Sequence, residues 1–338
     1  MSCTISGYLA TPEFLQTAAR IIGCIMIPMN LFGIFCILYK TSRKRQELKL
    51  CMLNLHLWTF WFDLEYTFLS NLYFFLPATA VAGLGIFSTV FHIPTKFLYY
   101  LDSFSSGGIA IAVVMLFENR HFNIIPFTSK LRIKNFKYRI VLAIFNFIIG
   151  SIYVVPALFF NFNQTDIKNK LLKIYPCPDP IFFTDQTFAL PEEANNYLGA
   201  FSSIAGLIII MQLVFFISHI CYWLYKVRET SAMSENAKRM QRKFFIATCI
   251  QIIIPILALV IPTWYMGYVI SSGYINQAVL NIFTLVVPLH GTAATIVSVI
   301  ANKSYRDFTI SLFMCRKKKV SSQMHVTNVS TVIKRSNY

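Results

Sequence analysis

The chain has 338 residues, of which 56% are hydrophobic and only 13% are charged. Soluble domains carry about 25% charged residues, so a chain with this balance would not stay dissolved. The formal net charge is +16, but the basic residues stand in short blocks between long uncharged runs, which argues against a nucleic-acid-binding surface. Composition therefore predicts an all-α integral membrane protein.

Seven apolar runs are long enough to cross a bilayer, whose hydrocarbon core requires about 20 residues per helix. We expect one domain over residues 17–302, with helices at about 17–39, 50–76, 96–118, 139–160, 197–225, 240–270 and 276–301. Residues 1–16 lack the basic and apolar regions of a signal peptide. The first helix is therefore expected to act as a signal anchor.

Lys and Arg residues set the expected orientation of the bundle. Twenty-five of the thirty lie in 40–49, 118–139, 226–243 and the segment from 301, and only four lie in the opposite loops. Because cytoplasmic loops carry the excess of positive charge, the N-terminus is expected outside and the C-terminus inside. The expected location is the plasma membrane, as a multi-pass protein.

The segment after the seventh helix has two parts. Residues 303–315 read as a short amphipathic helix at the membrane interface, ending at Cys315 beside a basic run. Cys315 is a candidate palmitoylation site, the alternative being an unmodified thiol. Residues 316–338 are polar and rich in Ser and Thr, which predicts a disordered cytoplasmic tail.

Five short motifs occur in a fixed order along the chain: Tyr8-Leu9-Ala10-Thr11-Pro12-Glu13-Phe14-Leu15, Leu53-Asn54-Leu55-His56-Leu57-Trp58, Phe117-Glu118-Asn119-Arg120-His121, Tyr175-Pro176-Cys177-Pro178 and Pro288-Leu289-His290-Gly291. Together they resemble the nematode serpentine chemoreceptors of class H (Srh), which are seven-transmembrane G-protein-coupled receptors. The resemblance covers essentially the whole chain. One departure is that Lys303-Ser304 precede Tyr305-Arg306, where the family usually has a proline.

The resemblance implies a receptor rather than an enzyme, serving olfaction in the cilia of a sensory neuron. Such a receptor binds a small odorant or pheromone-like molecule from outside and activates a heterotrimeric G protein. It needs no cofactor, and its other partners are membrane lipids, not nucleic acid.

The motif Glu118-Asn119-Arg120 lies where the third helix meets the cytosol. The resemblance implies that Arg120 takes part in G-protein coupling, whereas the simpler alternative is an arginine that anchors a helix end. Glu118 and Arg120 point to nearly opposite faces because they are two residues apart. Glu235 is the acid available at the inner end of the sixth helix, so we expect it to hold Arg120 in the resting state.

Asp102 is a candidate ligand-binding residue near the outer end of the third helix. It precedes Arg120 by eighteen residues, or about 27 Å at the rise of an α-helix. An acid inside the membrane is a functional candidate by default, so we expect Asp102 on the wall of an outer pocket. The alternative is a structural carboxylate paired with Lys96 or His92.

Several polar residues are expected to meet at mid-membrane. Counted from the inner ends of their helices, Asn30, His290 and Asp63 lie about 14, 15 and 20 Å deep. His56 lies on the same helix face as Asp63, whereas Glu65 points away. We expect this cluster to relay ligand binding toward the cytoplasmic end of the third helix, the alternative being independent residues bonded to nearby backbone.

The outer loops hold the remaining candidate sites. Cys3 and Cys177 could form a disulfide, the alternative being two free thiols, and Asn163-Gln164-Thr165 is a glycosylation sequon. Cysteine and histidine spacings give no metal site. Two other functions stay open: a transporter or channel that uses the intramembrane Asp, Glu and His residues, or a receptor-like protein that does not signal and assists trafficking.

Overall fold

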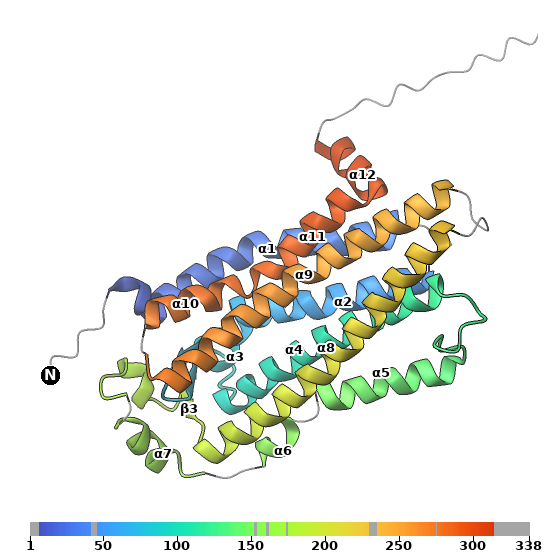
Figure 1. Cartoon of the computed structure of the whole chain (residues 1–338). Coiled ribbons are helices and arrows are strands. Elements are labelled where there is room, and N and C mark those ends of the chain that lie inside the picture. Colours follow the sequence, from blue (N-terminus) through green and yellow to red (C-terminus); the bar gives the residue numbers. More distant parts are fainter. Residues whose placement is uncertain are drawn as a thin grey trace, which may run out of the picture.

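The computed structural model describes residues 7–41, 46–151, 154–159, 162–173, 175–229, 235–274 and 276–313 (Figure 1). In this part of the chain, long helices run side by side as a bundle: α1 (Pro12–Lys40), α2 (Gln46–Leu64), α4 (Thr95–Ile124), α5 (Phe136–Ser151), α8 (Glu192–Glu229), α9 (Glu235–Ser272) and the consecutive pair α10 (Gln277–Val286) and α11 (Leu289–Ala301). Shorter elements are η1 (Tyr8–Ala10), η3 (Glu65–Leu69), α3 (Ile86–Thr89), α6 (Val155–Leu158), α7 (Gln164–Leu171), η5 (Pro180–Phe183) and α12 (Lys303–Phe313).

Length and apolar composition alone identify four membrane-spanning helices among the described residues, namely α1, α4, α8 and the stretch Gln277–Ala301. The remaining long helices are shorter or more polar in their described parts. α2 has 19 residues and contains Asp63, and α5 has 16 residues. Large apolar side chains on the outside of α5 and α8 are exposed, as expected for surfaces that face lipid.

The start of α1 follows from its sequence. Thr11 is the N-cap, and its hydroxyl accepts a hydrogen bond from the backbone N–H of Phe14 at 3.2 Å. Pro12 occupies the first helical position, where its missing N–H removes no hydrogen bond, and Glu13 lies in the first turn, where it favours the helix dipole. The helix therefore begins five residues earlier than the sequence predicted.

The second helix ends earlier than predicted, which corrects the expected range of 50–76. After α2 the chain forms the π-helical turn η3, whose Glu65 carbonyl accepts from the backbone N–H groups of Ser70 and Asn71 at 2.9 Å each. Residues 72–75 then form a β-strand. Their sequence, Leu-Tyr-Phe-Phe, is as apolar as a membrane helix but favours a strand, because aromatic residues pack well on a pleated surface.

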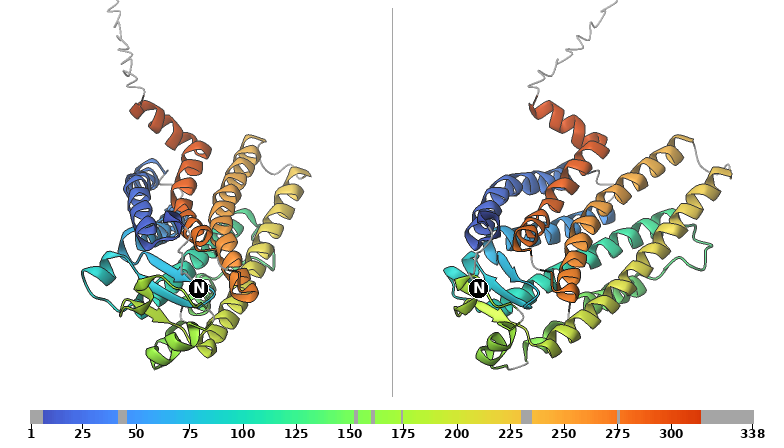
Figure 2. Two further views of the ribbon diagram at one scale, coloured as in Figure 1. Left: turned by 90° about the vertical axis from the view of Figure 1, so that its left-hand side faces the viewer. Right: turned by 60° about the vertical axis from the view of Figure 1, so that its left-hand side comes forward.

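A small antiparallel sheet lies at the end of the bundle opposite α12 (Figure 1). Its strands are β1 (Leu72–Phe75), β2 (Ala80–Gly83) and β3 (Thr187–Ala189). β2 is central, with Phe75 opposite Ala80 on one side and Ala80 opposite Ala189 on the other. Figure 2 shows the sheet gathered beside the N-terminal end of the described chain. The sheet thus joins the first and second outer loops.

The fourth helix also differs from its prediction of 139–160. α5 ends at Ser151, and a separate short helix, α6, follows at Val155–Leu158. Upstream, α5 packs closely on α4 where Gly107 faces the backbone of Gly150, and a Cβ atom at Gly107 would overlap the Gly150 carbonyl. Small residues at such a crossing let two membrane helices approach closely.

The seventh span is divided at Pro288, which has no N–H to continue the helical hydrogen-bond pattern and separates α10 from α11. α12 then turns away from α11 (Figure 1). It docks on α1 through Tyr305, which is 1% exposed and hydrogen-bonded to Thr41 at 2.5 Å, while Lys40 lies 4.0 Å above the ring of Phe308. A helix directly after the seventh span is therefore present, and Cys315 lies outside the described residues.

Candidate functional site

Three polar side chains from α1, α2 and α11 meet inside the bundle. Asn30 donates a hydrogen bond from Nδ2 to Asp63 Oδ2 at 3.0 Å, and His290 Nδ1 lies 3.4 Å from Asp63 Oδ1. All three residues are 1% exposed or less. The structure therefore brings together the residues that depth counting placed at one level, and we call Asn30, Asp63 and His290 the central cluster.

His56 forms the inner side of the central cluster. Its Nε2 lies 2.9 Å from the backbone carbonyl of Asn30, so this nitrogen carries the proton and donates it. A Cβ atom on Gly33 would lie 2.6 Å from the imidazole of His56. Glycine at position 33 therefore allows the imidazole to lie directly against the backbone of α1.

Gly291, the residue after His290, lies directly against the central cluster. A Cβ atom at this position would overlap Asp63 Oδ2 and would lie 3.2 Å from Asn30 Oδ1. The motif Pro288-Leu289-His290-Gly291 therefore has a local explanation. Pro288 starts the helix, His290 approaches Asp63, and Gly291 leaves room for the carboxylate.

The central cluster is not fully hydrogen-bonded. Asn30 Oδ1, Asp63 Oδ1 and His290 Nε2 are buried and have no hydrogen-bond partner among the described residues. A buried polar atom without a partner destabilises its conformation by about 1–3 kcal/mol. These three atoms therefore have hydrogen-bonding capacity that the described side chains do not use.

Asp102 lies elsewhere than expected. It is hydrogen-bonded to Tyr66, next to Glu65, and so faces the π-helical turn η3 that follows α2. Glu65 itself accepts from Ser105 Oγ at 2.9 Å. Lys96, one alternative partner, donates to the carbonyl of Leu158 at 2.5 Å. Asp102 belongs to a buried contact between η3 and α4, because the rotation of α4 about its axis turns this residue toward Tyr66.

A cavity of about 510 Å³ lies at the end of the bundle that carries the β-sheet, which is the end expected to face outward, and we call it the outer cavity. Its walls come from the β1–β2 hairpin, α4, α8 and α9. Asp102 is not among its lining residues, so the expectation that it lies on a pocket wall is wrong for this cavity. Polar groups that line it are Thr79, Tyr99, Asn195, Ser202, Ser203, Thr263 and Trp264. The other lining residues are apolar or glycine, and none of the lining side chains is charged.

At the end of the bundle away from the β-sheet, Glu118 pairs with Arg139 of α5. Arg139 donates from Nε and Nη2 to the carboxylate in a two-pronged contact at 2.8–3.0 Å, and Glu118 is 1% exposed. Arg139 Nη1 also lies 3.7 Å from Glu47 of α2, whose carboxylate accepts from Asn119 Nδ2 at 3.2 Å. Glu118 and Asn119 therefore connect α2, α4 and α5. The sequence motif did not indicate this structural role.

Arg120 points to another face of α4, as the two-residue spacing from Glu118 predicted. Its Nη2 donates to Thr248 Oγ1 of α9 at 3.5 Å. The expected partner Glu235 opens α9, but its side chain lies outside the part of the chain that the structure describes. Thr248 therefore provides a contact between Arg120 of α4 and α9, the helix that also carries Glu235.

A histidine pair that the sequence did not suggest connects α4 to α8. His121 Nε2 and His219 Nδ1 are 2.6 Å apart, and Trp223 Nε1 donates to His219 Nε2 at 3.0 Å. Because Trp223 can only donate, His219 carries its proton on Nδ1 and passes a hydrogen bond to His121. Their ninety-eight-residue separation gives no sequence signal of this contact.

Replacing Thr248 with valine keeps the shape of the side chain but removes the acceptor for Arg120. We expect Thr248→Val to raise basal G-protein activation about two- to threefold, since a long hydrogen bond contributes at the low end of 0.5–1.5 kcal/mol. Basal nucleotide exchange in membranes, normalised to surface expression, measures this. Thr309→Val on α12 is the matched control, and an unchanged or lower basal rate in Thr248→Val would contradict the role of the contact.

The outer-loop candidates are only partly described. Cys177 is disulfide-bonded, whereas Cys3 lies outside the described residues, so the pairing of these two stays a prediction. Asn163 is exposed and caps α7 by accepting from the backbone N–H of Thr165 at 3.1 Å. Its glycosylation is untested. Among the described residues, no group of three or more His, Cys, Asp or Glu could hold a metal ion.

Comparisons with known proteins agree with this architecture. A family model described as the serpentine type 7TM GPCR chemoreceptor Srh matches residues 10–315. The chain is 28% identical over 330 residues to serpentine receptor class H-72 of Caenorhabditis elegans, which covers 97% of this chain and 93% of the relative. Squid rhodopsin has a similar fold, with a TM-score of 0.60 at 10% identity over 93% of this chain and 91% of that one. The predicted family resemblance and seven-helix fold are confirmed.

Proposed function

Because this chain belongs to the serpentine type 7TM GPCR chemoreceptor family Srh, we propose that it is a chemosensory receptor of the plasma membrane, with its N-terminus outside and its C-terminus inside. Its ligand is a small uncharged environmental molecule that binds in the outer cavity. Binding activates a heterotrimeric G protein at the opposite end of the bundle. Sensory-neuron cilia are the proposed location.

The lining of the outer cavity carries this proposal. Walls that are mostly apolar, with a few hydroxyl and amide groups, suit an apolar molecule bearing one or two hydrogen-bonding groups, such as an alcohol, ketone or ester. A ligand cation would be desolvated there without a carboxylate to pair with it, which is strongly unfavourable. The outer cavity therefore supports a neutral ligand over the ammonium ligand that an intramembrane acid would favour.

The path to the cytoplasm runs along helices that contribute to both ends. α9 lines the outer cavity through Thr263 and contacts Arg120 through Thr248. α11 carries His290 of the central cluster. A ligand that shifts the outer part of α9 would therefore change the contact with Arg120, and the incompletely bonded central cluster provides a second element that can rearrange. We propose that Arg120 and its neighbours on α4 couple this change to the G protein.

The test reduces the space in the outer cavity by enlarging one residue of its wall. Gly199 of α8 lines the cavity, and a Cβ atom there would meet nothing within 4 Å. We expect Gly199→Leu to reduce or abolish responses to every active ligand, because the added side chain occupies space that the ligand needs. G-protein activation by a panel of neutral and amine odorants in a heterologous cell measures this, with the wild-type chain identifying the active compounds first.

Gly206 provides a matched control on the same helix. A Cβ atom at Gly206 also meets nothing within 4 Å, but this residue does not line the outer cavity. Gly206→Leu should therefore keep the wild-type response at equal surface expression. Equal responses of Gly199→Leu and wild type, or a wild-type panel in which only amines are active, would contradict the proposed ligand site.

A further inference from the structure

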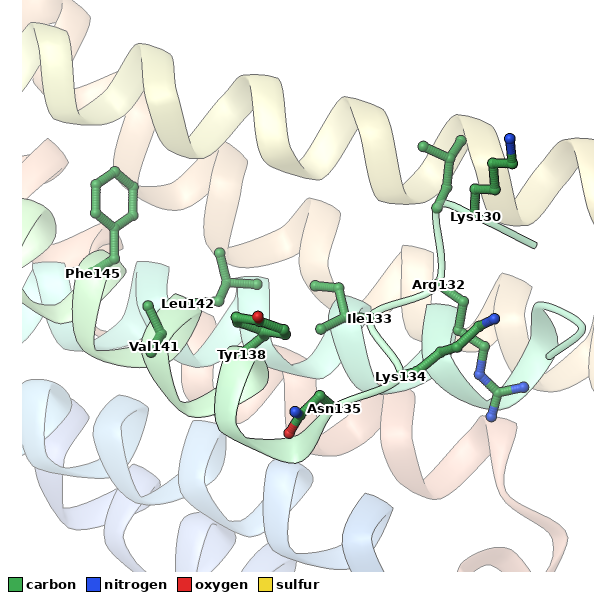
Figure 3. Close-up of a pocket in the computed structure, with 10 residues that line it drawn as sticks. Lys130, Arg132, Ile133, Lys134, Asn135, Tyr138, Val141, Leu142 and Phe145 are labelled. Carbon is green, nitrogen blue, oxygen red and sulfur yellow. The ribbon is translucent and has the colours of Figure 1, made fainter. Parts of the chain in front are cut away.

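A second cavity lies on the cytoplasmic half of the bundle, between the segment 130–135 and the first turns of α5 (Figure 3). Its volume is about 710 Å³. We call it the loop–α5 groove, and its lining residues are Lys130, Leu131, Arg132, Ile133, Lys134, Asn135, Tyr138, Val141, Leu142 and Phe145. The groove is remote from the outer cavity and shares no lining residue with it.

One wall of the loop–α5 groove is an apolar stripe. Tyr138, Val141, Leu142 and Phe145 follow one another at spacings of three, one and three residues, so they lie on one face of α5. The stripe extends about 10 Å along the helix axis. Tyr138 is 66% exposed, Val141 59% and Phe145 48%, so this face has no covering partner among the described residues.

The other end of the loop–α5 groove is basic. Lys130 and Lys134 are exposed and lie at the loop end, whereas Phe145 lies at the far end of the α5 face (Figure 3). The chain has no acidic residue between Glu118 and Asp166, and neither lysine has an acidic partner among the described residues. These two ammonium groups can therefore pair with a negative charge on another molecule.

Arg132, unlike the two lysines, is engaged in contacts within the protein that hold the loop in place. It donates from Nη1 to the carbonyl of Ile125 at 2.8 Å, and its guanidinium lies 3.6 Å above the ring of Phe127 and 4.3 Å above that of Phe122. These contacts anchor the segment that carries both lysines. The two ammonium groups are thus presented from a fixed loop at the membrane surface.

We propose that the loop–α5 groove binds an anionic phospholipid of the inner leaflet. The phosphate lies between Lys130 and Lys134, and one acyl chain lies along the stripe from Tyr138 to Phe145. Two features favour a lipid over a soluble partner or a second copy of this chain. The two lysines lie at the level of the lipid headgroups. The apolar stripe continues from there along α5 into the hydrocarbon region, which a cytosolic protein does not reach.

The experiment uses the full chain in phosphatidylcholine nanodiscs that contain a minor fraction of phosphatidylserine with a photoreactive acyl chain. After illumination, mass spectrometry quantifies lipid attached to the peptide that covers residues 136–151. Lys130→Ala/Lys134→Ala should lower this labelling about 25-fold, because each basic residue near the surface contributes on the order of a factor of five to anionic lipid binding. Lys130→Arg/Lys134→Arg should retain it.

The matched control removes two exposed cytoplasmic lysines that lie on other elements, Lys243 of α9 and Lys303 of α12. Lys243→Ala/Lys303→Ala should label like wild type, and a phosphatidylcholine probe with the same photoreactive chain should label wild type weakly. Equal labelling by both lipids, an equal loss in the control, or crosslinks to a second copy in place of lipid would overturn the proposal. No ligand or G protein is added, so this failure would leave the proposed receptor function standing.

Discussion

Gly291→Ala should abolish ligand-dependent signalling, although it adds only one methyl group. The added Cβ would overlap Asp63 Oδ2 and press on Asn30 Oδ1, so either the Asn30–Asp63 hydrogen bond or the path of α11 must change. Loss of a buried hydrogen bond to an acid destabilises by about 1.5–3 kcal/mol. Two measurements test this: G-protein activation at matched surface expression, and thermal unfolding of the purified chain followed by the reactivity of its buried Cys36.

Gly206→Ala is the control for replacing a helical glycine in a membrane span. A Cβ atom there meets nothing within 4 Å, and alanine is the better helix former, so we expect unchanged signalling and equal or higher stability. If Gly291→Ala also signals and unfolds like wild type, the close contact between α11 and Asp63 is not a feature of the working receptor.

Arg139→Ala should destabilise the receptor more than any loss of a surface charge. It leaves Glu118, which is 1% exposed, without its two-pronged partner. Breaking a buried ion pair by removing one partner destabilises by about 3–5 kcal/mol. We therefore expect little receptor at the cell surface and a strongly lowered unfolding midpoint in detergent. Lys at position 139 keeps the charge but cannot form the paired contact, so Arg139→Lys should be intermediate.

Two further variants separate the ion pair from general damage. Arg139→Ala/Glu118→Leu removes both charges and should recover part of the stability that Arg139→Ala loses, because no unpaired carboxylate stays buried. Arg306→Ala removes an exposed arginine and should change stability within about 0.5 kcal/mol. A double variant no more stable than Arg139→Ala would argue that Arg139 acts through its contact with the ring of Phe122 instead.

The central cluster could be predicted from the sequence because the rise per residue of an α-helix is constant. The depth of each residue along its helix placed Asn30, Asp63 and His290 at one level in the membrane. Because their three helices are neighbours, residues at one level were expected to meet. Asp102 shows the limit of the same method. Its depth near the outer end of the helix could be counted, but the direction of its side chain depends on how α4 packs, and that side chain faces η3.

Other features depend on contacts that hydropathy does not encode. The run at residues 72–75 is apolar enough to extend a helix, and only its pairing with residues 80–83 makes it a strand. Arg139 was counted only as one of the charges that set the orientation, although the acid Glu47 stands among the basic residues of 40–49 and could have suggested a local pairing. The uncharged lining of the outer cavity comes from four separate elements and has no single sequence signature.

The length of α9 has a mechanical consequence. With 38 residues it is about 57 Å long, nearly twice the thickness of a bilayer core. From Thr263 at the outer cavity to the start of the helix at Glu235 the lever is about 42 Å. A tilt of about 5° around the outer end would therefore carry the cytoplasmic tip sideways by about 4 Å. A molecule of a few atoms in the outer cavity needs to displace its wall by only a fraction of an ångström to move the far end by a distance that a bound protein can sense.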